Sequence, residues 1–372
     1  MKKLILASGI FVLAVCLYAC KKRLANTTTS QTVYLDLPEK TDVYYSGKKI
    51  VVPNQNEITT LGRVLFYDKH LSLNNAVPCA SCHKQEFAFA DDVAFSRGFE
   101  NRLTGRNSMP IENLTFTTEK FSLNMLGDQS FGGTGLFWDG RENSLKNLVG
   151  RPLTNHIEMG IDDVNSLPAK LAELPYYKKL FKDAYGTEQI SFDRISEAVA
   201  FFITSVKAAD TRYDQYITRR ASLTAEELHG LQLFNVKYNC GNCHRIDTMG
   251  YISSASMDIG LASKNSDGGV GDVTGRPQDM NVFRIPNLRN VGITAPYMHD
   301  GRFKTLHEVL DHYSSGIENT PNLNFQLRDM DGKPMRMNIS ATEKDALVAF
   351  LNTLTDYTMI TDPKYSDPFR LK

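Results

Sequence analysis

Apolar residues recur at helical spacing along most of the chain, and few stretches alternate with a period of two. In ITTLGRVLFYD, the side chains of Ile58, Leu61 and Leu65 fall on one face of a helix. A longer apolar helix is predicted for SFDRISEAVAFFITSV, residues 191–206. The pattern therefore predicts a mainly α-helical fold.

Three capping boxes mark further helix starts. TAEE at 224–227, TLHE at 305–308 and SATE at 340–343 each place Ser or Thr three residues before Glu. In this arrangement each side chain bonds the other residue's backbone N–H at a helix start. The first box predicts a helix that leads toward Cys240, and the last predicts an apolar helix near the C-terminal end.

Two polar stretches interrupt the helical pattern. The stretch DTRYDQYITRRAS, 210–222, separates a predicted N-terminal domain, 57–215, from a predicted C-terminal domain, 216–372. The glycine-rich stretch SKNSDGGVGDVTGRPQD, 263–279, lacks the strand-to-helix setting of a phosphate-binding loop. It is expected to be a loop only.

The N-terminal segment has the features of an export signal. A basic start precedes an apolar run to about Val15 that is too short to span a bilayer, so residues 1–20 are expected to be a signal peptide. The end of this segment resembles a lipobox with Cys20 as the lipidated residue; Cys16 is a weaker alternative, and a plain secretory signal is another. Residues 21–56 are expected to be a tether and N-terminal extension.

Composition narrows the class of protein. The 372 residues are 42% hydrophobic and 23% charged, which is typical of a globular protein. Lys plus Arg equals Asp plus Glu, 42 against 42, so the charge gives no indication of a nucleic-acid partner.

The cysteines point to the chemistry. Of six, two lie in the export segment, and the other four lie in CASCH, 79–83 (the first motif), and CGNCH, 240–244 (the second motif). Four thiolates could bind one zinc ion, and two pairs could be redox dithiols, but neither needs a histidine after each pair. Covalent attachment of c-type haem needs both features. The motifs therefore predict two haem c groups, with these cofactor-binding residues: Cys79, Cys82, His83, Cys240, Cys243 and His244.

Longer phrases around the motifs resemble the bacterial di-haem cytochrome c peroxidases, in particular their MauG branch. They are LGRVLFYDKHLSLNNAVPCASCH, FWDGRENSLKNLVGRPLTNHIEMG and FRIPNLRNVGITAPYMHDGRFKTLHEVLDHY, and with their spacing they cover roughly residues 57–355. The resemblance implies two cytochrome-c-like haem domains with a calcium site between them. It also implies a peroxidatic N-terminal haem that receives electrons from the C-terminal haem.

The resemblance also assigns the distal residues of the first haem. Glu158 would be the acid–base catalyst that moves a proton between the peroxide oxygens, and Trp138 would carry electrons between the haems. Leu148 stands where the family often has glutamine, and His156 stands where it often has proline. His156 could replace the lost function, ligate the iron or lie at the surface. No histidine occurs between Lys84 and Asn155, so an iron site open without prior reduction is expected.

At the second haem the resemblance points to a tyrosine. The distal ligand of the peroxidases is a methionine fourteen residues after the histidine of HDG, and counting from His299 gives Tyr313. The MauG branch has tyrosine here, and a phenolate favours ferric and higher states. Met298 and Met330 are alternative ligands without this spacing.

Calcium is assigned by the same resemblance. Its ligands would be Asn107 and the carbonyl oxygens of Thr294 and Pro296, with Asn113 as a rival to Asn107. Neutral oxygens suit calcium when water completes the shell.

Three functions remain open at this point. The first is a periplasmic enzyme that reduces hydrogen peroxide with electrons from a small cytochrome or other redox protein. The second is a MauG-like oxidant of a protein or other bulky substrate, and the third is a di-haem electron carrier. We expect no nucleic-acid partner, membrane contact only through the lipid anchor, and a homodimer as one assembly.

Overall fold

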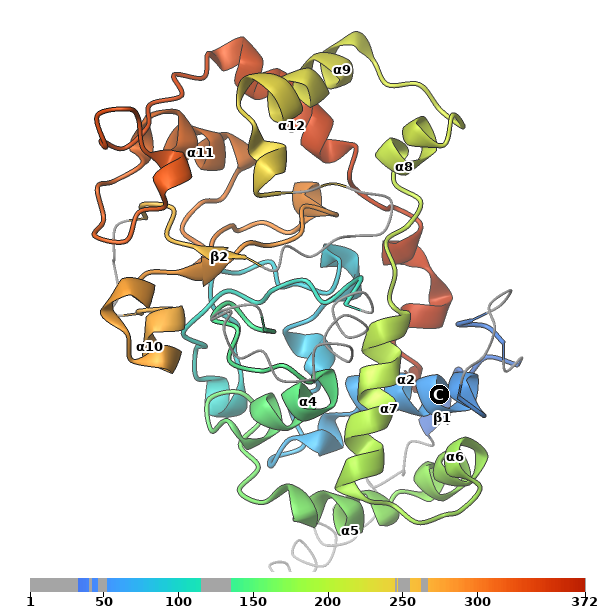
Figure 1. The fold of residues 1–372 in the computed structure, drawn as a ribbon. Coiled ribbons are helices and arrows are strands. Elements are labelled where there is room, and N and C mark those ends of the chain that lie inside the picture. The colour runs from blue at the N-terminus through green and yellow to red at the C-terminus, as the bar shows by residue number, and fades with distance from the viewer. Residues whose placement is uncertain are drawn as a thin grey trace, which may run out of the picture. The chain divides into compact units, whose positions relative to one another are not determined.

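The computed structural model describes residues 33–39, 42–45, 52–114, 135–244, 246, 255–261 and 267–371. The expected signal peptide and lipid anchor, and most of the tether, lie outside these residues. The described chain is mainly helical with short strands, as predicted (Figure 1). In this part of the chain no helix is long and apolar enough to cross a membrane.

The chain divides into two compact units. In the smaller, Met1–Leu37 with Pro368–Lys372, strand β1 (Val33–Leu35) pairs antiparallel with β4 (Phe369–Leu371). The larger unit, Pro38–Asp367, carries both cysteine motifs. The expected domain division between residues 215 and 216 falls inside this unit and stays a prediction.

In the first half of the larger unit, helix α2 packs against α6 and α7, and α4 also packs against α7. Helices α2 and α7 confirm the two predictions made from apolar spacing, whereas α4, α5 and α6 were not predicted. The bounds are α2 (Gln55–Tyr67), α4 (Leu145–Thr154), α5 (Leu167–Ala172), α6 (Pro175–Tyr185) and α7 (Phe192–Ser205).

In the second half, α12 packs against α9 and α11, and β2 pairs antiparallel with β3. The three predicted capping boxes are all present, at the starts of α9, α11 and α12. A fourth, at Thr211 and Asp214, begins α8 inside the polar stretch. The bounds are α8 (Arg212–Ile217), α9 (Ala225–Gln232), α10 (Val270–Thr274), α11 (Leu306–Asp311), α12 (Ala341–Asn352), β2 (Ser256–Met257) and β3 (Phe283–Arg284).

The expectation that 263–279 is a loop only was wrong for its described residues. They contain α10, followed by a 3₁₀ turn at Pro277–Asp279. A helix of five residues is too short to show apolar periodicity in the sequence. In the structure its first residue, Val270, is buried.

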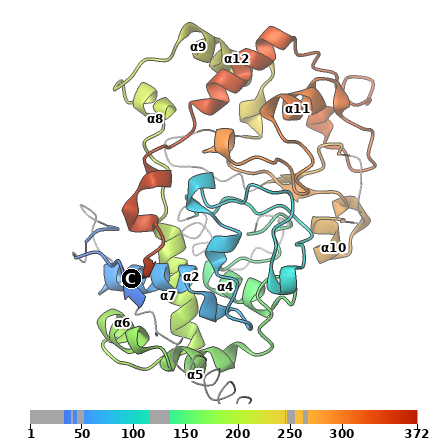
Figure 2. The same cartoon turned by 180° about the vertical axis from the view of Figure 1, so that it is seen from behind.

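A close helix crossing occurs once in each half. At Gly62 of α2, an added Cβ atom would lie 1.9 Å from the carbonyl oxygen of Ala198 in α7. At Gly230 of α9 the same distance to the Ala346 oxygen of α12 is also 1.9 Å. Only glycine permits this approach of two backbones. Both views show the two helix pairs side by side (Figure 1 and Figure 2).

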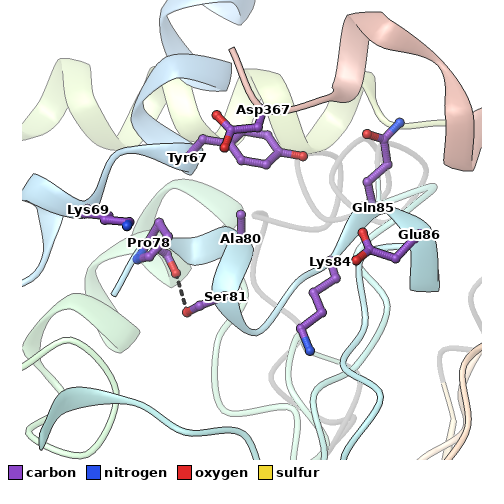
Figure 3. Close-up of a pocket in the computed structure, with 9 residues that line it drawn as sticks. All are labelled: Tyr67, Lys69, Pro78, Ala80, Ser81, Lys84, Gln85, Glu86 and Asp367. Atoms are coloured by element: carbon purple, nitrogen blue, oxygen red, sulfur yellow. Dashed lines mark hydrogen bonds between the residues drawn. The ribbon is translucent and has the colours of Figure 1, made fainter. Parts of the chain in front are cut away.

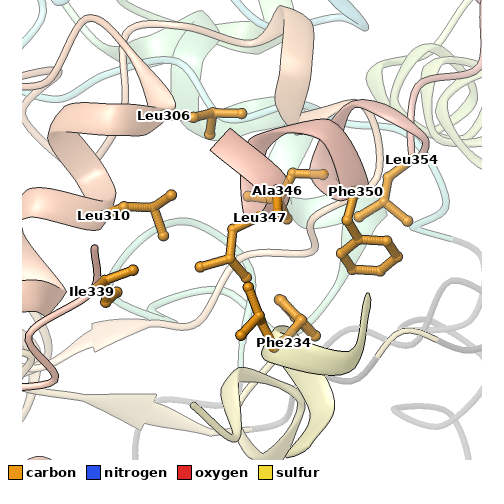
Figure 4. Packing of buried hydrophobic residues seen from close by; sticks show 10 residues of the cluster. Phe234, Leu306, Leu310, Ile339, Ala346, Leu347, Phe350 and Leu354 are labelled. Carbon is orange, nitrogen blue, oxygen red and sulfur yellow. The ribbon is translucent and has the colours of Figure 1, made fainter. Parts of the chain in front are cut away.

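The aromatic packing repeats as well. One helical turn after each glycine and each alanine comes a phenylalanine. The rings of Phe66 and Phe202 lie 5.1 Å apart at 55°, and those of Phe234 and Phe350 lie 5.4 Å apart at 57°. The second pair belongs to a buried cluster that also includes Leu347 (Figure 4). The repeat supports the expected pair of similar domains, with a motif following the first helix of each crossing.

Candidate redox site

The first motif is shaped to hold a histidine in one tautomer. A 3₁₀ turn at Cys79–Ser81 brings the His83 N–H to the Cys79 carbonyl oxygen at 3.0 Å. Nδ1 of His83 lies 2.8 Å from the Phe89 carbonyl oxygen, which can only accept a hydrogen bond. Burial lowers the pKa of this imidazole, so the ring is neutral and Nε2 keeps its lone pair for a metal.

The second motif repeats this geometry. The N–H of His244 donates to the Cys240 carbonyl oxygen at 2.9 Å, and its Nδ1 lies 3.2 Å from the Pro286 carbonyl oxygen. Burial again lowers the imidazole pKa. Both motifs therefore present Nε2 as a ligand beside two cysteines, which fits a haem iron and its thioether bonds.

The cysteine thiols fit neither a pair of redox dithiols nor a single zinc site. Burial is the main cause that raises the pKa of Cys79 to about 12 and of Cys240 to about 11, so neither is a reactive redox thiolate. All four thiols of the motifs are free, and the described residues contain no group of three or more His, Cys, Asp or Glu side chains able to hold a metal ion. A single four-cysteine zinc site is therefore excluded for this part of the chain.

Glu158 lies close to the first motif. After burial, which is the main cause, the charge of Glu158 is among the effects that raise the pKa values of Cys79 and Cys82. Burial raises the pKa of Glu158 itself, against the opposing effects of Arg141 and of Asn155, whose amide donates to Oε1 at 2.7 Å. The structure thus places a carboxyl group with proton affinity above the ordinary value beside the first motif.

Leu148 and His156, the two departures from the family pattern, differ in how exposed they are. Leu148 is partly buried on α4. The side chain of His156 is 62% exposed, and its Nε2 lies 3.6 Å from Asp162 Oδ1. This position agrees with the interpretation of His156 as a surface residue and gives it no part in the first motif.

Trp138 connects residues from the two halves. Its indole N–H donates to the Asn107 carbonyl oxygen at 2.9 Å, and its own carbonyl oxygen accepts from the N–H of Arg284 in β3 at 2.8 Å. The side chain is half-buried. Trp138 therefore bridges a loop of the first half and strand β3 of the second.

Tyr313 lies beside the second motif. It follows α11 in a π-helical turn, His312–Gly316, and packs on a small apolar cluster. Burial raises its pKa well above the usual range, and Cys240 and Cys243 raise it further. A phenol in apolar surroundings ionises only with a cation next to it, and a ferric iron would provide that charge. Met330 is fully exposed, which removes it as an alternative ligand.

The calcium candidates lie on two loops in contact. The Asn107 N–H donates to the His299 carbonyl oxygen at 2.7 Å, and its Nδ2 donates to the Val93 oxygen at 3.1 Å, which leaves Oδ1 as the atom for a cation. Thr294 and Pro296 lie on the loop that contains the cis peptide Ala295–Pro296, and both are buried.

The rival calcium ligand Asn113 has a different environment. Its Nδ2 donates to the Ala208 carbonyl oxygen at 3.1 Å, and its N–H donates to the Val206 oxygen at 3.0 Å. These bonds tie Asn113 to the chain after α7, whereas Asn107 is bonded to the loop of His299. The comparison favours Asn107.

One buried carboxyl group was missed by the sequence analysis. Glu112 is 4% exposed, and neither carboxyl oxygen is within good hydrogen-bond geometry of a partner among the described residues, although the Asn290 amide is near enough to act on its pKa. Burial raises its pKa to about 7, although its own backbone N–H, the Asn290 amide and the Arg289 charge act in the opposite direction. An isolated Glu in the sequence carries no signal of such burial.

A surface pocket of about 350 Å³ lies over the first motif (Figure 3). It exposes Ala80 and Ser81, the two residues between the cysteines, and Tyr67 lines it opposite them. The remaining lining residues are Lys69, Pro78, Lys84, Gln85, Glu86 and Asp367. The pocket therefore gives access from solvent to the edge of the first motif.

Residues 56–222 match the family model described as di-haem cytochrome c peroxidase. The methylamine utilization protein MauG of Methylorubrum extorquens is 30% identical over 340 residues, which covers 89% of this chain and 88% of that protein. The cytochrome c551 peroxidase of Nitrosomonas europaea is 29% identical over 311 residues, covering 82% of each.

Solved structures show the same fold. The crystal structure of a MauG-like protein associated with microbial copper homeostasis has a TM-score of 0.70 and 34% identity, and the match covers 84% of this chain and 93% of that one. A di-haem peroxidase from Burkholderia thailandensis has a TM-score of 0.67 at 24% identity.

Proposed function

Because the chain belongs to the di-haem cytochrome c peroxidase family, we propose that it is a periplasmic peroxidase that reduces hydrogen peroxide at the first motif. Electrons would come from a small cytochrome or other redox protein and pass through the second motif. Membership makes the protein a peroxidase-like oxidoreductase with two c-type haems. The export pattern of residues 1–20 supports the location and an anchor at Cys20.

The observation that carries the proposal is the asymmetry between two otherwise matched motifs. Each holds its histidine by an Nδ1–carbonyl contact. The first has the carboxyl group of Glu158 beside it, and the second has the phenol of Tyr313. An acid–base group favours peroxide cleavage, whereas an ionisable ligand favours storage of charge.

Haem, when bound, supplies the iron on which peroxide is reduced. Glu158 would take the proton from the near peroxide oxygen and return it to the far one, which leaves as water. Asn155 holds Oε1 of Glu158 and so orients the carboxyl group. The Phe89 carbonyl oxygen holds the His83 ring and raises the basicity of its Nε2.

Electron supply would use Trp138. Its indole N–H donates to Asn107 and its main-chain carbonyl oxygen accepts from Arg284, so the residue bridges the two halves. Calcium bound by Asn107, Thr294 and Pro296 would stiffen the same region. The pocket beside Ala80 and Ser81 is a candidate entry for an electron donor or small substrate (Figure 3).

A MauG-like oxidant of a bulky substrate is the second candidate, and Tyr313 favours it. A phenolate at the second iron would stabilise oxidised states there and oppose simple electron collection. Leu148, which cannot hydrogen-bond peroxide, favours the third candidate, an electron carrier.

Steady-state kinetics test the proposal. The haem-loaded protein, given peroxide and a reduced small c-type cytochrome, should oxidise the cytochrome over many turnovers. A MauG-like oxidant should do so poorly and keep a long-lived oxidised state, and an electron carrier should show no spectral response to peroxide.

A further inference from the structure

A buried carboxylate just after the end of α2 contacts two tyrosines and a histidine. Asp68, which follows α2, is 2% exposed. Its Oδ2 accepts hydrogen bonds from the phenols of Tyr177 at 2.6 Å and Tyr176 at 2.9 Å. Its Oδ1 lies 2.6 Å from Nδ1 of His70. None of these four residues has a role in the peroxide chemistry proposed above.

The two tyrosines form a path from the interior toward the surface. Tyr177 is fully buried, and Tyr176 beside it on α6 is partly exposed. Their ring centroids are 4.7 Å apart. The His70 side chain is 38% exposed, so the carboxylate network also reaches solvent.

The inner end of this path is near the first motif. The Cys79 thiol is one of the groups that raise the pKa of Tyr177, after burial and the Asp68 carboxylate. Helix α2 packs against both α6 and the 3₁₀ turn at Cys79–Ser81. Tyr177 therefore lies near Cys79, one of the two residues expected to attach the first haem.

The phenols of Tyr176 and Tyr177 differ from those of Tyr67 and Tyr365 in that their hydrogen-bond acceptor is a carboxylate. A buried phenol that loses an electron must also lose its proton, because the charged radical is a strong acid in surroundings that disfavour charge. Tyr67 and Tyr365 donate to main-chain carbonyl oxygens, at 2.7 Å and 2.8 Å, and a carbonyl does not take up that proton. A carboxylate does.

We propose that Tyr177 and Tyr176, with Asp68 as proton acceptor, conduct oxidising equivalents from the first haem to a one-electron donor at the surface. The proposal rests on the proposed function, because hydrogen peroxide acting at that haem is the oxidant. The donor is a small one-electron reductant, such as an ene-diol or phenol.

The steps balance in electrons and protons. Tyr177 gives one electron to the oxidised haem and its phenolic proton to Asp68 Oδ2. Tyr176 then gives an electron to the Tyr177 radical, which takes the proton back from Asp68, and the Tyr176 proton replaces it there. Finally the external donor reduces the Tyr176 radical, and Asp68 returns the proton.

Rapid-freeze electron paramagnetic resonance tests this on the full haem-loaded chain. Ferric protein mixed with peroxide should give a tyrosyl radical, identified by narrowing of the signal when tyrosine is deuterated. Tyr177→Phe should lose this signal, while the rate at which the haem absorbance responds to peroxide stays at the wild-type value. Asp68→Asn should also lose it, at unchanged haem content.

Tyr365→Phe is the matched control, because this buried phenol donates to a main-chain carbonyl oxygen, and it should keep the radical. Tyr176→Phe should keep a radical on Tyr177 but slow its decay with ascorbate. A wild-type signal in Tyr177→Phe, or an oxidised haem without any tyrosyl radical in the wild type, overturns the proposal alone. A haem absorbance that never responds to peroxide overturns the proposed function, and this proposal with it.

Discussion

The indole N–H of Trp138 donates a hydrogen bond of 2.9 Å to the main-chain carbonyl oxygen of Asn107. The same Asn107 donates its own N–H to the carbonyl oxygen of His299 at 2.7 Å. The residue expected to relay electrons is thus attached directly to a residue expected to bind calcium. Loss of a cation at Asn107 would loosen the position of Trp138.

Calcium removal should therefore slow electron transfer between the two haems. Chelation followed by stopped-flow reduction measures this rate, and emission spectroscopy measures the calcium content. Asn107→Ala should lose calcium and become insensitive to the chelator. Asn113→Ala loses the side-chain hydrogen bond to Ala208 and should keep the wild-type calcium content. An equal loss of calcium in both variants would contradict the assignment of Asn107.

Two haems should stay on the polypeptide after acid–acetone extraction, because thioether bonds survive this treatment. A pyridine haemochrome assay gives the number per chain. Replacing Cys240 and Cys243 by Ala should leave one haem, bound at the first motif. A colourless wild-type protein would be incompatible with the assignment of both motifs.

Tyr313→Phe should change the low-spin ferric signal of one haem only, since the phenyl ring cannot ligate iron. Tyr313→Met should raise the reduction potential of that haem. Tyr297→Phe is a suitable control because this phenol donates to the Val291 carbonyl oxygen and is only partly buried. If Tyr313→Phe and wild type have the same ferric spectrum, Tyr313 is not a ligand.

Glu158→Gln should slow the reaction of ferric protein with peroxide by about 10²–10⁴-fold, the usual contribution of a general acid–base group, with haem content unchanged. Since burial raises the Glu158 pKa, the wild-type rate should fall as pH drops through a value above 4.5, and this limb should vanish in Glu158→Gln. The exposed Glu100→Gln is the control, and an equal effect there would argue against catalysis by Glu158.

Glu112→Gln should stabilise the fold above neutral pH. Burial raises the folded pKa from 4.5 to about 7, so the folded state favours the protonated form. Stability is then highest below pH 4.5 and falls as pH rises toward 7, with a total cost of about 3 kcal/mol for ionisation. Thermal unfolding between these pH values should show a slope in wild type that Glu112→Gln lacks. A parallel slope in both would contradict this burial.

The sequence predicted best the features that depend on neighbouring residues. Capping boxes such as Thr224 with Glu227 involve residues three apart, and both of their hydrogen bonds form in the structure. The haem motifs are local for the same reason. In contrast, the bond between Tyr177 and Asp68 joins residues 109 apart, and no local pattern indicates such a pair.

The close helix crossings could be predicted from the sequence only in part. Gly62 and Gly230 are each followed four residues later by phenylalanine, a similarity that is visible in the sequence. Its meaning depends on Ala198 and Ala346, whose carbonyl oxygens occupy the space of the missing side chains. The short helices α8 and α10 were missed because they have too few residues to show apolar periodicity, although α8 begins with a local capping box at Thr211 and Asp214.

The helix crossings also bear on when haem can be attached to the chain. In each half the helix that completes the crossing comes after the motif: α7 begins at Phe192, behind Cys82, and α12 begins at Ala341, behind Cys243. A chain that is made from its N-terminus thus presents each motif before the helix that completes the crossing exists. In the folded protein the pKa of Cys79 is raised to about 12, which leaves little thiolate to attack a vinyl group. We therefore expect covalent attachment of haem to precede the packing of the helix that completes each crossing.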